Sequence, residues 1–489
     1  MMKSAFKKIL LGILALVVLL LAVLVFNALT FSSVQQKVQL VKLKVDEQAA
    51  ARRLSGALKI KTITINGQKI DPKPFTAFRA YLEKTFPEAH KVLKREIING
   101  HALLYTWQGT DSKLEPILLM GHQDVVPIAA PKSWKHPAFS GLIKDGYIWG
   151  RGALDDKSTI LALLEGVSHL AKQGFKPKRT VYLAFGHDEE IGGAEGAKQI
   201  AKTLKERKVK LQYVLDEGLA ITEGILAGLK PPTALIGLAE KGYLTLKLVA
   251  KSAGGHSSMP PPHTAVGILS TAIHKLEGDP FPASLRNPVD LLFQHIGPEF
   301  GFGRKMIFSN LWLFRPILLG ILSKKNSTNA MIRTTTAATM FSGSNKENIL
   351  PSQASATVNF RILPGETTKS VIARVKKVID NPKVQIKVAS GSFAKDPSFV
   401  SSHTTDSYKQ LVKTIQQVIP EVIVAPSLVM GGTDSRHYKD LTQSIYRFMP
   451  IRVGPKDLKR IHGINERISV KNYGECVQFY TQLLKNTAK

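Results

Sequence analysis

Histidine and carboxylate side chains recur in this sequence directly after short apolar segments that are typical of buried strands. Three such segments lie at 117–120, 181–185 and 211–215. Each is followed within a few residues by groups that can bind a metal ion or transfer a proton: His122, Asp124, Asp188, Glu189, Glu190, Asp216 and Glu217. Because ligands of open parallel sheets bind beyond the carboxyl ends of the strands, we expect these side chains to share one crevice.

A fourth cluster, the acidic pair Asp155 and Asp156, precedes a predicted helix, and we expect it to face the same crevice. Carboxylates that converge in this way repel one another, and some must stay protonated unless a cation neutralises them. Cys476 is the one cysteine in 489 residues, so cysteine-based zinc sites and disulfide frameworks are excluded. Histidine with carboxylate suits a divalent ion such as zinc. Each cluster taken singly also has a structural interpretation, as a helix start or a turn.

Two patterns of apolar residues predict two kinds of sheet. The unbroken apolar segments alternate with helices expected at 158–173 and 194–208, which indicates a parallel sheet covered on both faces. Strict alternation at 243–249 and 356–362 instead indicates an antiparallel sheet with one face exposed to solvent. The first pattern returns from about residue 398. We therefore expect one α/β domain that is interrupted by a smaller domain.

An uncharged apolar run at 9–26 lies near the N-terminus. As a helix it would be about 27 Å long, close to the thickness of the hydrocarbon core of a bilayer. Lys3, Lys7 and Lys8 precede it, which places the N-terminus in the cytoplasm and the main part of the chain in a periplasmic, extracellular or luminal space. We predict an uncleaved signal anchor. A cleaved signal peptide is the alternative, although no convincing cleavage site follows the apolar run.

The charge balance is strongly basic, with 67 Lys and Arg against 37 Asp and Glu, a formal net charge of +30. Such a field favours anionic partners. The basic residues are scattered, however, and no zinc-finger or RNP-like pattern occurs, so we expect no nucleic-acid partner. A Phe- and Leu-rich segment at 292–322 has three interpretations that the sequence leaves open: an apolar acyl pocket, a membrane-facing patch, or ordinary core.

Six motifs occur in an order that resembles a known enzyme family. They are His-x-Asp at 122–124, Gly-Arg-Gly-x-x-Asp-Asp-Lys at 150–157, Asp-Glu-Glu at 188–190, Asp-Glu-Gly at 216–218, Gly-His-Ser-Ser at 255–258 and His-Gly-x-Asn-Glu at 462–466. This order is similar to that of the M20 family of di-zinc metallopeptidases and aminoacylases. Within the family, the chain most resembles the branch of carboxypeptidase S and the N-fatty-acyl-amino-acid hydrolases.

The resemblance implies two zinc ions, or another divalent ion such as Co²⁺ or Mn²⁺ in their place. The implied ligands are His122, Asp155, Glu190, Asp216 and His462, with Asp155 as the bridge and Glu217 as an alternative to Asp216. The resemblance also implies that Glu189 is the general base and that Asp124 orients the His122 ring. These roles agree with the chemistry, because water between two metal ions loses a proton near neutral pH and an adjacent carboxylate can accept it.

The interrupting domain resembles the lid or dimerisation domain of the family. His256 would reach the site of a partner subunit in a homodimer and stabilise the oxyanion. Asn348 and Arg361 resemble oxyanion and substrate-carboxylate contacts, the latter because arginine binds carboxylates in a bidentate manner. Thr433 and Arg436 lie in a loop that resembles a second carboxylate cradle; a tight glycine turn is the alternative interpretation.

The fold class that we expect is therefore α/β: a parallel-sheet zinc-hydrolase catalytic domain interrupted by a smaller α+β lid or dimerisation domain, with an N-terminal transmembrane helix. The expected boundaries are 1–32 for the cytoplasmic tip and anchor, 33–53 for a helical stalk, 54–240 and 396–489 for the two parts of the catalytic domain, and 241–395 for the lid domain with an insertion near 280–330.

These features predict a membrane-anchored di-zinc hydrolase that cleaves the amide bond next to an amino acid with a free carboxylate. Its substrates would be short peptides or N-acyl amino acids. The alternative is a non-enzymatic, membrane-tethered binding protein on the same fold, which predicts broken metal positions, and none is broken. A serine hydrolase and a zincin are excluded, because neither Gly-x-Ser-x-Gly nor His-Glu-x-x-His occurs.

Overall fold

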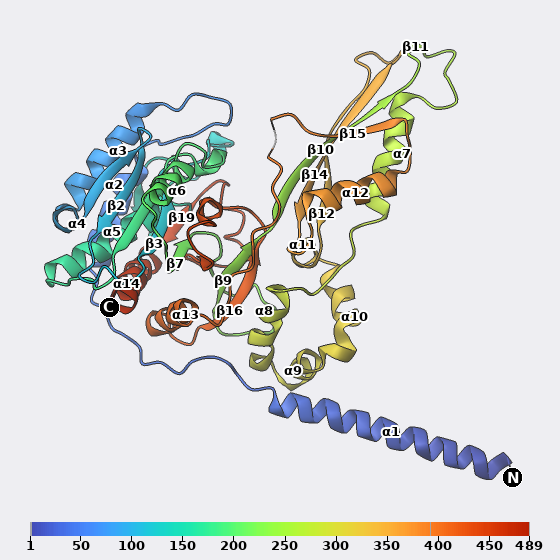
Figure 1. Ribbon diagram of the computed structural model, residues 1–489, viewed down its shortest axis with the longest axis horizontal. Helices are drawn as coiled ribbons and strands as arrows, with labels where there is room; N and C mark the ends of the chain where they lie inside the picture. Colours follow the sequence, from blue (N-terminus) through green and yellow to red (C-terminus); the bar gives the residue numbers. More distant parts are fainter. Residues whose placement is uncertain (1, 392, 489) are drawn as a thin grey trace.

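A large mixed sheet forms the centre of the larger unit in the computed structural model, which describes residues 2–391 and 393–488 (Figure 1). Its strands in spatial order are β1 (Lys94–Ile98), β2 (Ala102–Trp107), β6 (Val181–Gly186), β3 (Ile117–His122), β7 (Tyr213–Asp216), β17 (Ile445–Arg447), β9 (Thr233–Glu240), β8 (Ile221–Thr222) and β18 (Arg452–Val453), and β16 (Ile423–Val429) pairs with β9.

The strands at the centre of this sheet are parallel, as predicted, but the sheet as a whole is mixed. The central strands β6, β3, β7 and β17 are parallel to one another. At one edge of the sheet, β2 pairs antiparallel with β6, and β1 pairs antiparallel with β2. Asn99 and Gly100, with φ of 46° and 86°, turn the chain between β1 and β2. A tight hairpin can join only antiparallel strands, so this local turn accounts for the difference at that edge.

Helices cover both faces of the large sheet. α5 (Lys157–Lys172) and α14 (Val470–Thr487) pack on one face, and α6 (Ala197–Glu206) packs on the other. Successive residues of β3 point to opposite faces: Leu119 belongs to the core formed with α5 and α14, and Leu118 belongs to the core formed with α6. Every residue of β3 is buried, which explains the unbroken apolar pattern of this strand.

The segment that we assigned to a stalk is helical only in its last part. The connector at 31–46 contains no helix or strand, and α2 begins at Glu47 and ends at Leu58. Ala50, Ala51 and Leu54 of this helix are fully buried in the core formed with α5 and α14. α2 is therefore part of the larger unit, together with α3 (Pro72–Thr85), α4 (Pro87–Val92) and α13 (Asp406–Val418).

The smaller unit contains the antiparallel sheet that strict alternation predicted. β10 (Gly242–Lys251) follows β9 after one residue and enters a four-stranded sheet with β12 (Thr335–Ser342), β14 (Gln353–Ile362) and β15 (Val384–Val388). One face of β14 packs against α7 (Ala265–Gly278) and α12 (Thr368–Ile379). The end of this unit farthest from the large sheet carries β11 (Gly255–His256), which pairs with β13 (Ile349–Leu350) (Figure 1).

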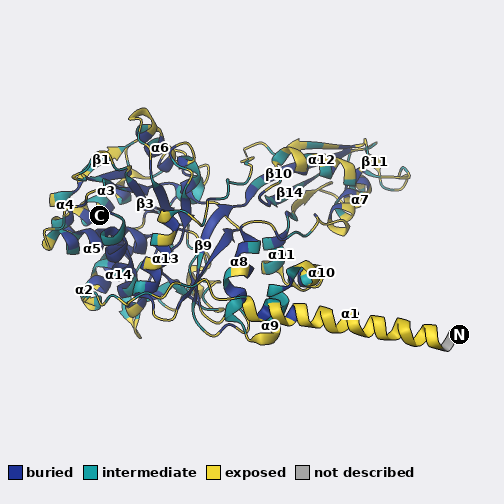
Figure 2. Cartoon of the chain, turned by 60° about the horizontal axis from the view of Figure 1, so that its bottom comes forward, coloured by how far each residue is buried: buried dark blue, intermediate teal, exposed yellow. Residues whose placement is uncertain are grey.

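The segment predicted as an insertion contains the short helix η3 (Gly297–Glu299) and four α-helices, of which the second contacts the N-terminal helix. The α-helices are α8 (Val289–Ile296), α9 (Phe302–Ser309), α10 (Leu311–Leu322) and α11 (Asn326–Ile332). α1 (Met2–Thr30) extends away from both units and is exposed over most of its length (Figure 2). With a mean hydropathy of 3.5 over an 18-residue window of Ser4–Thr30, α1 is long and apolar enough to cross a membrane.

Candidate metal centre

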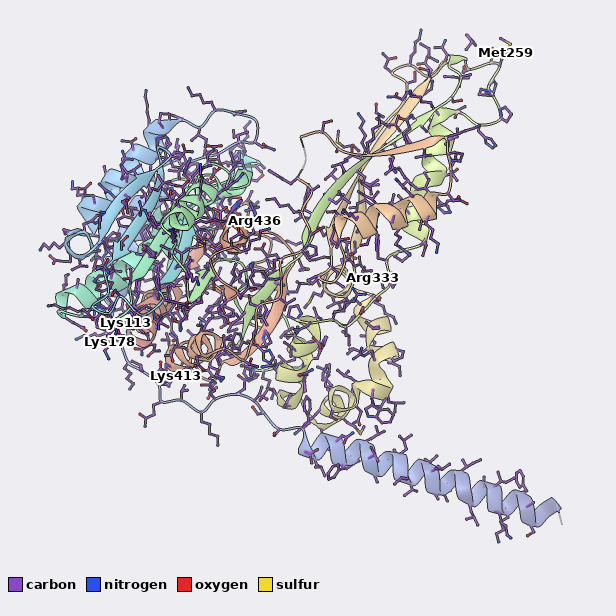
Figure 3. The ribbon with its side chains drawn as sticks, in the orientation of Figure 1. Lys113, Lys178, Met259, Arg333, Lys413 and Arg436 are labelled. Atoms are coloured by element: carbon purple, nitrogen blue, oxygen red, sulfur yellow. The ribbon has the colours of Figure 1, made fainter. Side chains whose placement is uncertain are left out.

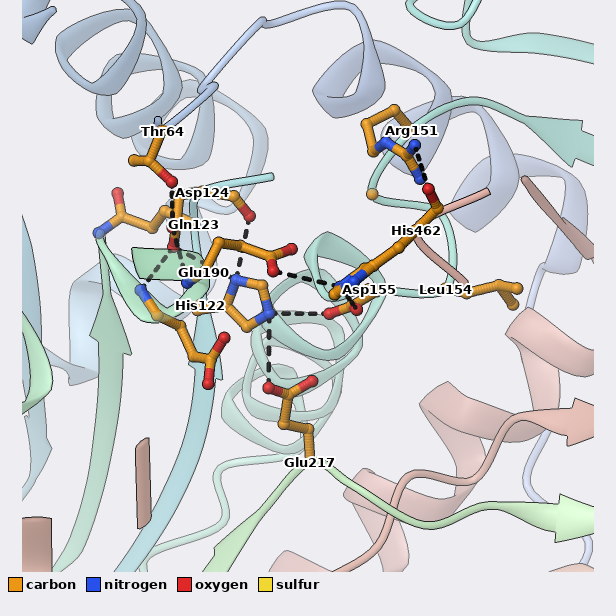
Figure 4. Close-up of polar contacts among 12 residues, drawn as sticks. Thr64, His122, Gln123, Asp124, Arg151, Leu154, Asp155, Glu190, Glu217 and His462 are labelled. Carbon is orange, nitrogen blue, oxygen red and sulfur yellow. Dashed lines mark hydrogen bonds and ion pairs between the residues drawn. The ribbon is translucent and has the colours of Figure 1, made fainter. Parts of the chain in front are cut away.

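Asp155 lies between two histidines that are distant from each other in the sequence (Figure 4). Its Oδ1 is 2.9 Å from Nε2 of His122, and its Oδ2 is 3.0 Å from Nε2 of His462. Each histidine has a further carboxylate beside it: Oε1 of Glu217 lies 3.5 Å from His122 Nε2, and Oε2 of Glu190 lies 3.2 Å from His462 Nε2. The arrangement thus consists of two histidine–carboxylate pairs that share one aspartate.

The elements of the large sheet bring these five side chains together. His122 is the last residue of β3, Glu190 lies in the short helix η2 (Glu189–Ile191) after β6, and Glu217 directly follows β7. Asp155 lies two residues before α5, and His462 lies in the loop between β18 and β19 (Arg467–Ser469) with a φ of 58°. β6, β3 and β7 are parallel neighbours, so their carboxyl ends meet at one edge, where the predicted crevice lies.

Asp216 and Glu217 have different partners. Oδ2 of Asp216 accepts a hydrogen bond from the backbone N–H of Ser435 at 2.7 Å, whereas Glu217 contacts His122. Neighbouring residues in extended backbone point to opposite sides, so a shift of one position decides which carboxylate reaches the histidine. The expected carboxylate partner of His122 was Asp216, with Glu217 as the alternative. The geometry supports the alternative, Glu217.

Asp156 is a further carboxylate at this centre; we expected it in the same crevice but did not count it among the metal ligands. Ligand atoms of His122, Asp156 and Glu217 lie within 4.8 Å of one another, as do those of His122, Asp155 and Glu190. Both side-chain oxygens of Asp156 are buried and have no hydrogen-bond partner among the described residues. A buried carboxylate without a partner is costly unless a cation satisfies it.

Asp124 connects His122 to the turn that carries Glu189 and Glu190. Its Oδ1 lies 3.3 Å from Nδ1 of His122, and its two oxygens accept the backbone N–H groups of Glu189 and Glu190, each at 3.1 Å. Thr64 donates a further hydrogen bond to it at 2.7 Å. Asp124 is fully buried, so these contacts can hold the imidazole ring of His122 in a fixed orientation.

A buried ion pair joins the Asp155 segment to the His462 loop. Arg151 and Glu466 are 1% and 0% exposed, and Nη1 of Arg151 donates to Glu466. Oε1 of Glu466 also accepts three backbone N–H groups of the segment 152–155 at 2.8–3.2 Å. Nη2 of Arg151 donates to the carbonyls of His462 and Gly463. Both residues lie within the quoted motifs, and we had assigned them no role, because their partners are brought together only by folding.

Crowded negative charge shifts the pKa of the groups at this centre. Burial would lower the pKa of His122, but Glu217 and the other carboxylates around it outweigh burial and hold this pKa well above its usual range. Burial and nearby carboxylates raise the pKa of Asp156, Glu189 and Glu217 well above their usual values. A divalent cation would relieve this repulsion, and imidazole nitrogens with carboxylate oxygens form a donor set that fits zinc.

The residues predicted to bind substrate lie in three places. Thr433 is buried, and its hydroxyl donates to Glu240 at 2.6 Å, so this side chain supports the loop. Arg436 of the same loop donates to the backbone carbonyl of Gly192, next to the η2 turn. Arg361 lies at the root of the smaller unit, with its guanidinium 4.6 Å from the centroid of the Tyr243 ring.

His256 and Asn348 lie together, but not at the metal centre of their own chain. His256 is exposed in β11, and the backbone N–H of the next residue, Ser257, donates to the Asn348 carbonyl at 3.1 Å. Oδ1 of Asn348 is buried and has no partner among the described residues. Met259, three residues beyond His256, marks this end of the smaller unit in Figure 3, far from the sheet that carries the metal centre.

The chain is similar to known proteins over most of its length. Residues 118–486 match peptidase family M20/M25/M40. The chain is 44% identical to the probable carboxypeptidase S-like 2 of Dictyostelium discoideum, over 96% of this chain and 92% of the relative. It is 42% identical to the N-fatty-acyl-amino acid synthase/hydrolase PM20D1 of Xenopus tropicalis, over 96% and 93%. The structure of an M20 family metallo-carboxypeptidase from Sulfolobus solfataricus is similar in fold, with a TM-score of 0.64 and 20% identity over 91% of this chain and 100% of that chain.

Proposed function

Because this chain belongs to peptidase family M20/M25/M40, we propose that it is a membrane-anchored di-zinc hydrolase that cleaves the amide bond next to an amino acid with a free carboxylate. Membership of the family and of its carboxypeptidase S and N-fatty-acyl-amino-acid hydrolase branch agrees with the prediction from the sequence. That the chain binds two metal ions, that α1 anchors it in a membrane, and which role each residue of the site has are our proposals.

Two ions are proposed because the two oxygens of Asp155 face different histidines, each with its own carboxylate. In this assignment His122 and Glu217 would hold one ion, Glu190 and His462 would hold the other, and Asp155 would be shared between the two. Asp156 lies close enough to His122 and Glu217 to add negative charge on the first side. Zinc suits these ligands, and Co²⁺ or Mn²⁺ is compatible with them.

Glu189 is the group that we assign as general base. Bound ions would polarise the scissile carbonyl and make water more acidic. Glu189 directly precedes the ligand Glu190, and among the described residues its carboxylate has no hydrogen-bond partner, although its backbone N–H donates to Asp124. Burial and the charge of Glu217 raise its pKa. A carboxylate with a raised pKa can take a proton from water and pass it to the amine as the carbon–nitrogen bond breaks.

We propose that the smaller unit of a second copy of the chain contributes residues to the metal centre. His256 and Asn348 lie at the far end of this unit, where they cannot serve the metal centre of the same chain without a large movement (Figure 1). In a homodimer, the partner's copy of this end would supply an imidazole and an amide to the oxyanion. Arg361 and Arg436 remain the proposed contacts for the substrate carboxylate.

The substrate class and the anchor rest on two further observations. The relatives named above are a carboxypeptidase S-like protein and an N-fatty-acyl-amino acid synthase/hydrolase, so short peptides and N-acyl amino acids are both proposed substrates. α1 has the length and hydropathy of a membrane span, and the lysines before it favour a cytoplasmic N-terminus with the catalytic unit on the opposite side.

The test uses full-length protein in detergent, assayed with dipeptides and N-acyl amino acids alongside metal analysis. We expect about two ions per chain and loss of activity with a chelator, because paired metal sites of this kind bind two ions. Glu189→Gln should keep both ions and lose about 10²–10⁴-fold in rate, the usual contribution of a general base. Glu206→Gln, at an exposed glutamate of α6, is the matched control. A metal-free active enzyme, or a Glu189→Gln variant with normal turnover, would overturn the proposal.

A further inference from the structure

Apart from Arg315, the exposed side of α10 consists of apolar residues and glycine. Its members recur every three to four residues, so they share one side of the helix: Trp312, Leu313, Pro316, Ile317, Gly320 and Ile321, called the α10 face below. Trp312, Ile317 and Ile321 are 61%, 60% and 57% exposed. A helix in contact with water on one side usually carries polar residues there.

The opposite side of α10 is also apolar, and it is packed. Leu318 is buried in a core that includes Leu292, Phe293 and Ile296 of α8, and Leu311, Leu319 and Leu322 pack against the same core. Apart from the exposed Arg315, α10 is therefore apolar on all sides although only one side is covered by protein. Helices of this kind are found inside large cores or in membranes, and no described residue covers the α10 face.

α10 begins where the N-terminal helix reaches the rest of the protein. Nδ2 of Asn27 donates to Oδ1 of Asn310 at 2.8 Å, and Nδ2 of Asn310 donates to the Leu24 carbonyl at 3.0 Å. Leu24 and Ala28, in the last turns of α1, are buried against this region, and Asn310 is fully buried. The residue that precedes α10 thus holds the end of α1, and α9 and α10 lie beside that end (Figure 2).

We propose that the α10 face lies in the surface layer of the bilayer that α1 enters, so that the protein contacts the membrane at two adjacent places. This inference rests on the proposed membrane anchoring, but not on the proposed chemistry. α10 contains 12 residues, about 18 Å of helix, which is too short to cross a bilayer core of about 30 Å. It is bent by 109° from α9, so the pair does not form one straight span. A short apolar helix fixed beside a span fits the interfacial position instead.

The charges around α10 match the headgroups of anionic lipids. The sequence contains no Asp or Glu between Glu299 and Glu347, and the basic residues Arg304, Lys305, Arg315, Lys324 and Lys325 lie in α9, in α10 or directly after α10. Arg315, Lys324 and Lys325 are exposed in or next to α10. Basic side chains at the edge of an interfacial helix can extend to phosphate groups while their stems stay among apolar groups, and tryptophan is common at the same depth.

Site-directed fluorescence tests this position in the full-length protein. An environment-sensitive thiol dye is attached at Ile317→Cys, and the protein is reconstituted in vesicles of phosphatidylcholine and phosphatidylglycerol. Met259→Cys, at an 81% exposed position at the far end of the smaller unit, is the control outside the membrane, and Leu16→Cys, 67% exposed on α1, is the control inside it. Native Cys476 is buried and should remain unlabelled, which the parent chain verifies. A Tm equal to that of the parent chain verifies that each labelled variant is folded.

Lipids with nitroxides on their acyl chains should quench the probe at Ile317 by about twofold or more, because an interfacial helix inserts its apolar side to the acyl-chain boundary. The Met259 probe should be unaffected. An Ile317 probe that behaves as the Met259 probe does, while the Leu16 probe is quenched, would overturn the inference and leave the anchor intact. Protection of Ile317 from aqueous iodide without quenching by lipid would also overturn it, since a second protein copy would then cover the face. An unquenched Leu16 probe would refute the proposed anchor separately.

Discussion

Replacing Arg151 by methionine should destabilise the protein and disorder its metal centre at the same time. Methionine keeps much of the side-chain length and removes the guanidinium. Glu466 would then be a buried carboxylate with only three backbone N–H partners, and the carbonyls of the 462–463 segment would lose their donor. Removing one member of a buried ion pair typically costs about 3–5 kcal/mol, because the remaining charge has no compensation. Both side chains of this pair are almost completely buried, so we expect a loss of this size in the free energy of unfolding.

The measurement is thermal unfolding of the full-length protein in detergent, together with metal analysis. A loss of this size lowers Tm on the order of 10 °C in a domain of a few hundred residues. Because the pair joins the Asp155 segment to the His462 loop, the metal content should fall as well. Arg207→Met is the matched control: Arg207 also pairs with a glutamate, Glu96, but its side chain is 42% exposed, and such surface pairs contribute about 1 kcal/mol or less. An Arg151→Met variant with the Tm and metal content of Arg207→Met would refute this account of how the two ligand segments are held.

Three other outcomes are expected. Glu217→Gln should lower the metal content while Asp216→Asn leaves it unchanged, because only Glu217 contacts His122; equal loss in both variants would argue against this assignment. If His256 acts across a dimer, mixing the inactive His256→Ala and Glu189→Gln proteins should restore activity, since one site in each mixed dimer is then complete; no recovery on exchange of subunits would count against it. Burial lowers the pKa of His187 to about 4, against an ordinary 6.5. The folded state therefore binds fewer protons than the unfolded chain in this window and loses stability as the pH falls from 6.5 towards 4. His187→Gln should weaken that pH dependence of Tm in chelator-treated protein, and an unchanged profile would show that other groups cause it.

The family, the alternation of strands and helices, and the approximate place of the site could be predicted from the sequence. Buried parallel strands must be apolar on both faces, so β3, β6 and β7 can be recognised in the sequence as unbroken apolar segments. The polar residue after each segment marks the end of the strand. The antiparallel sheet of the smaller unit was predicted for the complementary reason, because β14 alternates buried and partly exposed residues. Both patterns are local, and a linear sequence records local patterns directly.

The tertiary structure alone shows which of Asp216 and Glu217 contacts His122, that Arg151 pairs with Glu466, and which side of α10 is free. Each depends on the direction of a side chain or on a partner hundreds of residues away: Glu466 lies 315 positions from Arg151, and Asn310 lies 283 from Asn27. Residue type shows that a group can bind a cation, pair with a charge or avoid water. Which partner such a group contacts is fixed only when the core packs, because packing sets the direction of each side chain and its distance from the others.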